Sequence, residues 1–189
     1  NSLSESERNA VTEIKVADGY NGQKITNLKG IEFFPNLEEL YCDNNQLTSL
    51  DVSQNKALKY LNCSENQLTS LDVSENIALQ KLSCYRNQLT SLDVSQNTQL
   101  KELRCYGNQL TSLDLSQNHA LENLQVMENC LTSLDLSPTV VSTLYAAGNQ
   151  IDINVEETPR TFNLSTLPGK FDVTKATKWK GGTVSGNTL

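Results

Sequence analysis

Leucines recur at a fixed spacing between Leu37 and Leu136, and the polar positions between them recur with the same period. Five copies of one pattern, L-x-x-L-x-C-x-x-N-Q-L-T-S-L-D-(V/L)-S-x-N-x-x, cover this stretch with a few substitutions. A repeat this regular predicts a solenoid in which each copy forms one coil, because only stacking of the coils buries their apolar side chains. The copies are 21 residues long and begin at Leu37, Leu58, Leu79, Leu100 and Leu121.

Leucine at the first, fourth and eleventh places, with asparagine at the ninth, indicates leucine-rich repeats. The expected fold class is an α/β-type repeat solenoid, a right-handed superhelix with a parallel β-sheet on its concave face and mostly irregular convex segments. Leucines at the fourth place should form one continuous apolar column. These are Leu40, Leu61, Leu82, Leu103 and Leu124.

Both ends of the chain depart from the pattern, as terminal coils do when one of their faces meets solvent. Residues 1–36 are expected to form an N-terminal cap with a degenerate repeat. In this cap Ser4 and Glu7 have the spacing of a capping box, which predicts a short helix over about Glu5 to Asn9 that covers the first coil. Residues 37–155 hold five full repeats of 20 to 21 residues and one partial repeat. Residues 156–189 should form a truncated C-terminal cap.

The stretch from Ile25 to Leu37, with the Leu-x-x-Leu-x-Cys and Leu-Thr-Ser-Leu-Asp-Val-Ser-x-Asn motifs that follow it, resembles a known family. It is similar to the extracellular leucine-rich-repeat domains of bacterial surface proteins of the internalin J type. The resemblance runs from about Val11 to Leu189. It implies a secreted or surface-anchored bacterial protein with a role in adhesion or host interaction. No apolar signal-peptide segment follows Asn1, so we expect any targeting segment to lie outside this sequence.

Four of the five cysteines recur every 21 residues at the inward sixth place. Equivalent Cα atoms on neighbouring coils should lie about 4.8 Å apart with parallel Cβ vectors, whereas a disulfide needs Cβ atoms about 3.5–4.5 Å apart. We therefore predict a ladder of free, buried thiols that act as small apolar side chains. Cys130 lies at the tenth place, where the other full repeats have glutamine. It is either an accessible thiol or a neutral replacement for glutamine. The ladder residues are Cys42, Cys63, Cys84 and Cys105.

Asparagine recurs in two columns that we predict to be structural. An amide side chain both donates and accepts, so each can bond backbone groups in the turn after the strand and in the next coil. The ninth-place column is Asn45, Asn66, Asn87, Asn108 and Asn129, continued by Asn149. A second column, expected to act in the same way, is Asn55, Asn76, Asn97 and Asn118.

Aspartate fills the fifteenth place of every repeat, and a serine follows it two residues later. This spacing predicts an Asx turn, in which the carboxylate accepts backbone N–H bonds. Calcium is the alternative, because it would relieve repulsion between stacked carboxylates, but it needs about 6–8 oxygen ligands and the repeat supplies few others. We favour the turn and predict no metal site. The column is Asp51, Asp72, Asp93, Asp114 and Asp135.

The third, fifth, seventh and eighth places differ from coil to coil and should point outward from the concave sheet, because side chains alternate along a strand. Tyrosine and arginine, which gather there, are enriched at binding hot spots, although tyrosine is also a good β-former. We expect Tyr85 and Tyr106 to stack, with Lys81, Arg86 and Arg104 nearby, as an amphipathic patch with a positive bias. The candidate ligand-binding residues are Tyr41, Tyr60, Lys81, Tyr85, Arg86, Glu102, Arg104, Tyr106, Gln125, Met127 and Tyr145.

Composition and motifs narrow the classes of function that the chain can have. A net charge of -7 disfavours nucleic acid as a partner, and no apolar run approaches the roughly 18 residues that span a membrane. No phosphate-binding loop, zinc-type cluster or nucleophile elbow occurs, and the only histidine, His119, lies at a variable loop place. We predict a monomeric, non-enzymatic module without a cofactor that recognises a protein or glycan at a cell surface. A passive spacer that presents another module and a targeting arm of a larger enzyme are the alternatives.

Overall fold

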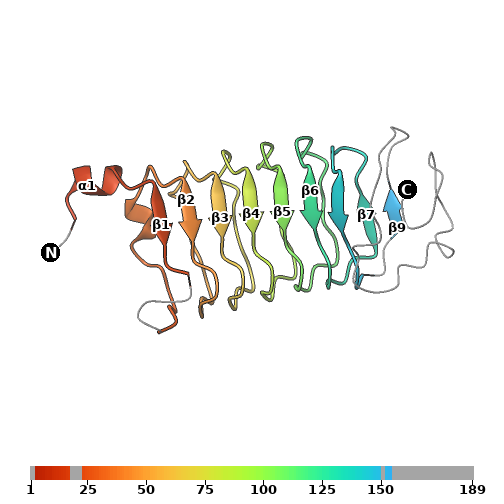
Figure 1. Cartoon of the computed structure of the whole chain (residues 1–189), viewed down its shortest axis with the longest axis horizontal. Helices are drawn as coiled ribbons and strands as arrows, with labels where there is room; N and C mark the ends of the chain where they lie inside the picture. Colours follow the sequence, from red (N-terminus) through yellow and green to blue (C-terminus); the bar gives the residue numbers. More distant parts are fainter. Residues whose placement is uncertain (1–2, 18–22, 150–151, 155–189) are drawn as a thin grey trace.

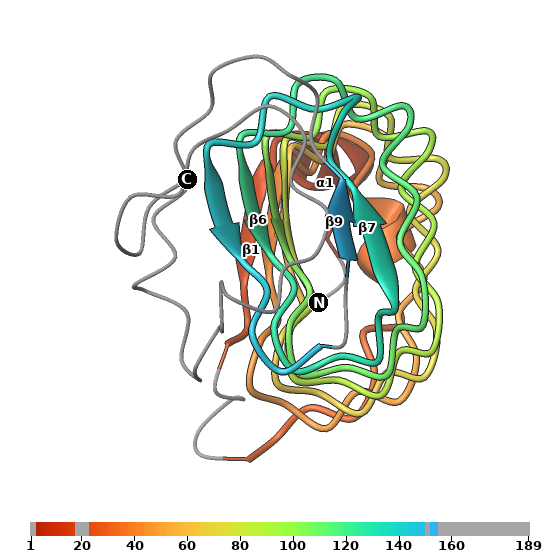
Figure 2. The same ribbon diagram turned by 90° about the vertical axis from the view of Figure 1, so that its right-hand side faces the viewer.

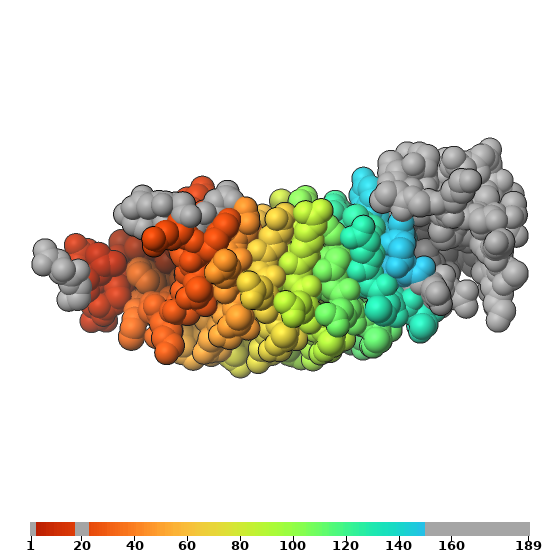
Figure 3. Space-filling view, turned by 90° about the horizontal axis from the view of Figure 1, so that it is seen from below, coloured from red at the N-terminus to blue at the C-terminus, as the bar shows by residue number. Residues whose placement is uncertain are grey.

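The coils stack side by side into an elongated solenoid (Figure 1). The computed structural model describes residues 3–17, 23–149 and 152–154. In the space-filling view, successive coils follow one another without a gap across the repeats (Figure 3). The period of the sequence is therefore also the structural period.

Seven parallel strands form the long sheet, in the order β1, β2, β3, β4, β5, β6, β8. Each is three residues long, and each strand of a full repeat covers the third to fifth places. The register pairs fourth-place residues, from Ile14 opposite Leu40 to Leu124 opposite Leu144. The strands are β1 Glu13–Lys15, β2 Glu39–Tyr41, β3 Tyr60–Asn62, β4 Lys81–Ser83, β5 Glu102–Arg104, β6 Asn123–Gln125 and β8 Thr143–Tyr145.

The core is a set of columns that run along the solenoid. In every full repeat the first, fourth, sixth, eleventh and sixteenth places are buried. Leu82 and Leu103, in the middle of the stack, have no exposed surface. Burying one leucine side chain contributes about 1.5–3 kcal/mol, and each coil obtains this only from its neighbours. The predicted leucine column is thus confirmed.

Ninth-place asparagines link neighbouring coils through buried hydrogen bonds. The Nδ2 of Asn66 donates to the carbonyl oxygens of Cys42 at 3.0 Å and Cys63 at 3.1 Å. Its Oδ1 accepts from the N–H of Leu47 at 2.9 Å. The bonds between coils reach the preceding coil, not the next coil as expected. Equivalent contacts involve Asn45, Asn87, Asn108, Asn129 and Asn149.

The second asparagine column differs from the first. The Nδ2 of Asn76 donates to the carbonyl oxygens of Val52 at 3.0 Å and Asn55 at 2.9 Å. Its Oδ1 is buried and accepts no hydrogen bond from the residues that the structure describes. The column therefore joins coils only through its amide nitrogens, so the expectation that it acts as the ninth-place column does is wrong. Asn55, Asn97 and Asn118 share this arrangement.

The helix α1, Glu5–Asn9, has the expected bounds and the expected capping box. The Oγ of Ser4 accepts from the N–H of Glu7 at 3.3 Å, and a Glu7 carboxylate oxygen accepts from the N–H of Ser4 at 2.7 Å. None of its residues is buried. It reaches the coils through surface contacts, such as the Arg8 guanidinium 5.9 Å from the centre of the Phe33 ring. Its cap, rather than an apolar face, accounts for its formation.

The side opposite the long sheet is irregular over most of its length, as expected, with two exceptions. A short 3-10 helix, η1, covers Ile31–Phe33. Near the other end β7, Ser133–Asp135, pairs in parallel with β9, Asp152–Asn154. Figure 2 shows this pair facing the long sheet from across the core. The partner strand β9 belongs to the sixth, partial repeat.

The eighth place lies in the tight turn after each strand. Glu65, Arg86 and Glu128 have φ angles of 53°, 50° and 52° there, and Gly107 and Gly148 have 63° and 76°. This left-handed conformation strains residues that have a Cβ atom. The strand alternation on which the expected outward direction of the eighth place rested therefore does not extend to this residue, because it lies in the turn after the strand.

Replacing Glu128 by glycine should raise the free energy of unfolding by about 1 kcal/mol, since glycine adopts a left-handed conformation without steric cost. Chemical denaturation followed by circular dichroism measures this change. Glu122→Gly is the matched control, because Glu122 is exposed in the same coil and its φ is not positive. The free energy of unfolding of the control variant should fall by about 0.5–1 kcal/mol. Equal losses in both variants would contradict strain at the eighth place.

Candidate ligand-binding face

The outward side chains of the third, fifth and seventh places, together with the eighth-place residues beside them, form one face of the molecule, which we name the sheet face. In β2, β3, β5 and β6 the fourth-place residue is buried and both of its neighbours are partly exposed, whereas in β4 the fifth-place Ser83 is buried as well. Lys81 and Arg86 are exposed. The other candidate residues are half-buried, namely Tyr41, Tyr60, Tyr85, Glu102, Arg104, Tyr106, Gln125, Met127 and Tyr145.

Tyr85 and Tyr106 stack on adjacent coils, as predicted. Their ring centres lie 4.4 Å apart and their planes differ by 5°. An aromatic pair contributes about 0.5–1.5 kcal/mol beyond its buried area, so the two rings hold each other in place. Burial is the main cause that raises the pKa of Tyr106, and the neighbouring Tyr85 adds to it. The stack is a rigid aromatic element near the middle of the sheet face.

Residues beside the stack in the same column are more enclosed than expected. Ser64 precedes Tyr85 at the seventh place and has no exposed surface. The outward direction predicted for the seventh place does not leave this residue exposed, because its small side chain has larger seventh-place residues on both neighbouring coils. Met127 follows Tyr106 in the column and is half-buried. The seventh-place column is thus a closely filled row.

A second tyrosine pair joins the first two full coils. The ring centres of Tyr41 and Tyr60 are 4.8 Å apart, with planes tilted by 32°. The Nζ of Lys15 lies 5.1 Å from the centre of the Tyr41 ring. The Tyr41 hydroxyl donates to Glu39 at 2.8 Å, and this bond is the main cause that raises the pKa of Tyr41 to about 12. Sequence reasoning missed Lys15, although it occupies the fifth place of the degenerate first repeat.

The basic residues of the predicted patch are paired with carboxylates. Glu102 lies 2.6 Å from the Nε of Arg104 and 3.7 Å from the Nζ of Lys81. Glu65 lies 3.4 Å from the guanidinium of Arg86. Three cations therefore share two carboxylates, and the positive bias is smaller than expected. Glu65 was missed as a site residue, although it holds the eighth place one coil before Arg86.

The third and fifth places are neutral in the C-terminal part of the sheet face. Gln125 and Tyr145 lie side by side at the fifth places of β6 and β8. Asn123 and Thr143 face each other at the third places of the same strands. The charged side chains of the predicted site therefore gather in the middle coils, around the tyrosine stack.

The four ladder cysteines are free and buried, as predicted. Burial is the main cause that raises the pKa of Cys63 and of Cys105 to about 12. It also raises the pKa values of Cys42 and Cys84 well above the usual thiol value. The thiols thus stay protonated and unreactive at neutral pH. Cys130 is exposed.

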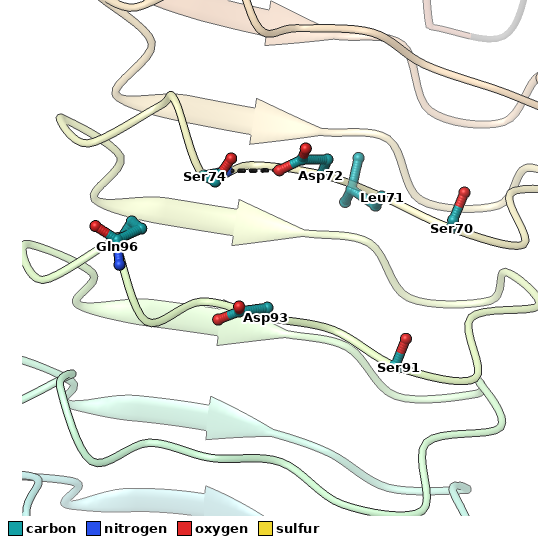
Figure 4. A pocket seen from close by; sticks show the side chains of 7 residues that line it. All are labelled: Ser70, Leu71, Asp72, Ser74, Ser91, Asp93 and Gln96. Carbon is teal, nitrogen blue, oxygen red and sulfur yellow. Dashed lines mark hydrogen bonds between the residues drawn. The ribbon is translucent and has the colours of Figure 1, made fainter.

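The fifteenth-place aspartates form Asx turns on the return side. The N–H of Ser74 donates to an Asp72 oxygen at 2.9 Å, and the same bond recurs in every full repeat at 2.8–3.0 Å. Figure 4 shows Asp72 and Asp93 on successive coils. In the described ranges no group of three or more His, Cys, Asp or Glu side chains is placed to hold a metal ion. A pocket there is lined by Ser70, Leu71, Asp72, Ser74, Ser91, Asp93 and Gln96.

These turns should make stability depend on acid pH. The serine N–H is the first cause that lowers the pKa of Asp51, Asp72, Asp93 and Asp114 below the usual value of 3.8. A lowered folded-state pKa contributes stability above the unfolded pKa and loses it as pH falls through the folded pKa. The melting temperature should therefore drop below about pH 4.

Thermal melts between about pH 2 and pH 7 measure this drop. The control replaces the same four aspartates by asparagine, which keeps an oxygen acceptor but does not titrate. The asparagine variant should show a smaller drop below about pH 4. If it loses stability as steeply as the wild type, the turns are not responsible.

Comparison with solved structures supports the repeat architecture. No family model and no curated protein matches the chain. The functional domain of InlJ from Listeria monocytogenes, described as including a cysteine ladder, is similar with a TM-score of 0.69 and 31% identity. That match covers 93% of this chain and 44% of the other.

Two further structures share the fold. The internalin InlF from Listeria monocytogenes has a TM-score of 0.65 and 22% identity, over 69% of this chain and 40% of the other. The leucine-rich-repeat domain of APL1B has a TM-score of 0.64 and 26% identity, over 71% of this chain and 44% of the other. The chain spans less than half the length of these structures. The expected leucine-rich-repeat solenoid is confirmed. In the part of the chain that is described, no helix could cross a membrane.

Proposed function

We propose, from the premise that the chain is a leucine-rich-repeat protein of the internalin J-like type, that its sheet face recognises a protein or glycan at a cell surface. The observation that carries the proposal is the Tyr85–Tyr106 stack, 4.4 Å between ring centres, with Arg86 and Arg104 on the neighbouring places. Tyrosine and arginine are the residue types that most often dominate binding energy. The module acts without catalysis, as a monomer, in a secreted or surface-anchored bacterial protein.

The geometry of the sheet face supports recognition because its side chains are ordered before a partner arrives. Tyr41 is held by Tyr60, Lys15 and Glu39. Arg104 is held by Glu102. Ordering a flexible side chain on binding costs about 0.5–1.5 kcal/mol, so contacts that already fix these groups reduce that cost. Buried, protonated ladder thiols are poorly suited to act as nucleophiles, which also favours binding over catalysis.

Partner capture from host-cell membrane extracts and a glycan array would test the proposal. The immobilised chain should retain a partner in at least one assay, and Tyr85→Ala/Arg104→Ala/Tyr106→Ala should weaken binding by at least about 100-fold. Circular dichroism should show that this variant is folded, because none of the three residues is in the core.

The matched control is Thr69→Ala/Gln96→Ala/Gln117→Ala, which changes three exposed residues outside the sheet-face columns. It should bind as the wild type does. Equal binding by both triple variants would refute the sheet face as the recognition surface. Failure of the wild type in both assays would favour the passive spacer.

A further inference from the structure

The two tyrosine pairs of the sheet face are flanked by neighbouring side chains. Tyr85 and Tyr106 cover one face of each other, and Ser64 and Met127 occupy the same column on either side of them. Tyr41 lies between Tyr60 and the Nζ of Lys15. The rings therefore present mainly their edges and hydroxyl groups to a partner. Ring edges carry partial positive charge, so oxygen-rich groups fit them better than the apolar face of a sugar ring does.

Around the stack, the cationic side chains are more exposed than the carboxylates with which they pair. Side-chain exposure is 54% for Lys81 and 42% for Arg104, against 17% for the Glu102 that pairs with both. It is 63% for Arg86 and 38% for its partner Glu65. In each pair the cation lies further out than the carboxylate. A partner that approaches the middle of the sheet face therefore meets ammonium and guanidinium groups first.

Acidic side chains limit this cationic layer to the middle coils. Glu39 and Asp43 lie towards the N-terminal end of the sheet face, and both are half-buried. Glu128 is exposed on the C-terminal side of the stack. A uniform polyanion that runs along the solenoid would meet these carboxylates as well as the cations. A short acidic stretch avoids them, because like charges in close contact cost free energy.

We propose that the partner is a protein that places a short acidic segment over the middle coils. This inference rests on the proposed function of the sheet face and names the chemistry of its partner. Aspartate or glutamate carboxylates of the segment contact Lys81, Arg86 and Arg104, and its backbone and side chains pack on the edges of Tyr85 and Tyr106. Glu65 and Glu102 hold the guanidinium groups in position for these contacts.

Panning a phage-displayed library of random short peptides against the full chain would test the proposal. Enriched clones should carry more Asp and Glu than the input library. A fluorescein-labelled peptide from these clones should bind at least about tenfold more weakly to Lys81→Gln/Arg86→Gln/Arg104→Gln. Its affinity should also fall between about 0.05 M and 0.5 M NaCl, because salt screens the charge pairs.

The matched control is Lys56→Gln/Lys59→Gln/Lys101→Gln, which removes the same charge from exposed residues outside the sheet-face columns. It should bind the peptide as the wild type does. Neutral or basic enriched clones, no enriched clones, or an equal loss in both variants would overturn the proposal. Heparin or dextran sulfate that binds more tightly than the peptide would overturn it in favour of a polyanionic glycan.

Failure of this inference can be told apart from failure of the proposed function. If Tyr85→Ala/Arg104→Ala/Tyr106→Ala abolishes capture of a partner that proves neutral, basic or a glycan, only the acidic-segment inference fails. If that variant changes no interaction of the chain, the sheet face is not the binding surface and both fail.

Discussion

Replacing Asn66 by alanine should lower the free energy of unfolding by about 3–4 kcal/mol, because a buried N–H left without its acceptor costs about 1–3 kcal/mol and each further hydrogen bond lost costs about 0.5–1.5 kcal/mol. The N–H of Leu47 would lose its acceptor. The carbonyl oxygens of Cys42 and Cys63 would each lose one of two donors and keep the amide of Asn45 or Asn87. These groups belong to two neighbouring coils, so water cannot replace the amide without opening the stack. Urea denaturation followed by circular dichroism measures the loss.

Gln67→Ala is the control for this experiment. Gln67 follows Asn66 directly, has a longer amide side chain and is exposed. A surface substitution of this kind usually changes stability by no more than about 0.5 kcal/mol. Similar losses in both variants would show that the ninth-place amides do not join the coils.

Replacing Leu103 by alanine should lower the free energy of unfolding by about 3–4 kcal/mol, which is within the range for truncating a buried leucine. Leu103 is the central residue of β5 and has no exposed surface, with Leu82 and Leu124 beside it in the register. A coil in the middle of a solenoid is stabilised from both sides, so a cavity there weakens two interfaces. Differential scanning calorimetry would record a lower melting temperature.

Ile14→Ala is the matched comparison, because Ile14 holds the same place in β1. It is half-buried and pairs on one side, with Leu40. Its truncation should lower the free energy of unfolding by about 1–2 kcal/mol, since the substitution removes less buried apolar surface. A loss as large as that of Leu103→Ala would contradict the view that interior coils depend on two neighbours.

Much of the candidate site could be predicted from the sequence, but its pairings could not. The stacking of Tyr85 on Tyr106 followed from their identical places in adjacent repeats. Lys15 was overlooked because it lies in a degenerate repeat. Glu65 was overlooked because column position alone does not show that its side chain reaches Arg86. The pattern identified which residues share a face, and side-chain conformation decided which of them interact.

The sequence by itself determined the solenoid, its parallel sheet, its leucine and cysteine columns and the Asx turns. Its regular period makes this possible, because each coil repeats the contacts of the last and distance along the chain becomes distance along the axis. The tertiary structure decided what the repeat pattern left open. It placed the left-handed eighth residue in a turn, directed the amide of Asn66 to the preceding coil and paired β7 with β9. It also paired Lys81 and Arg104 with Glu102. These features depend on backbone angles and on side chains that meet across coils, and a repeat pattern encodes neither.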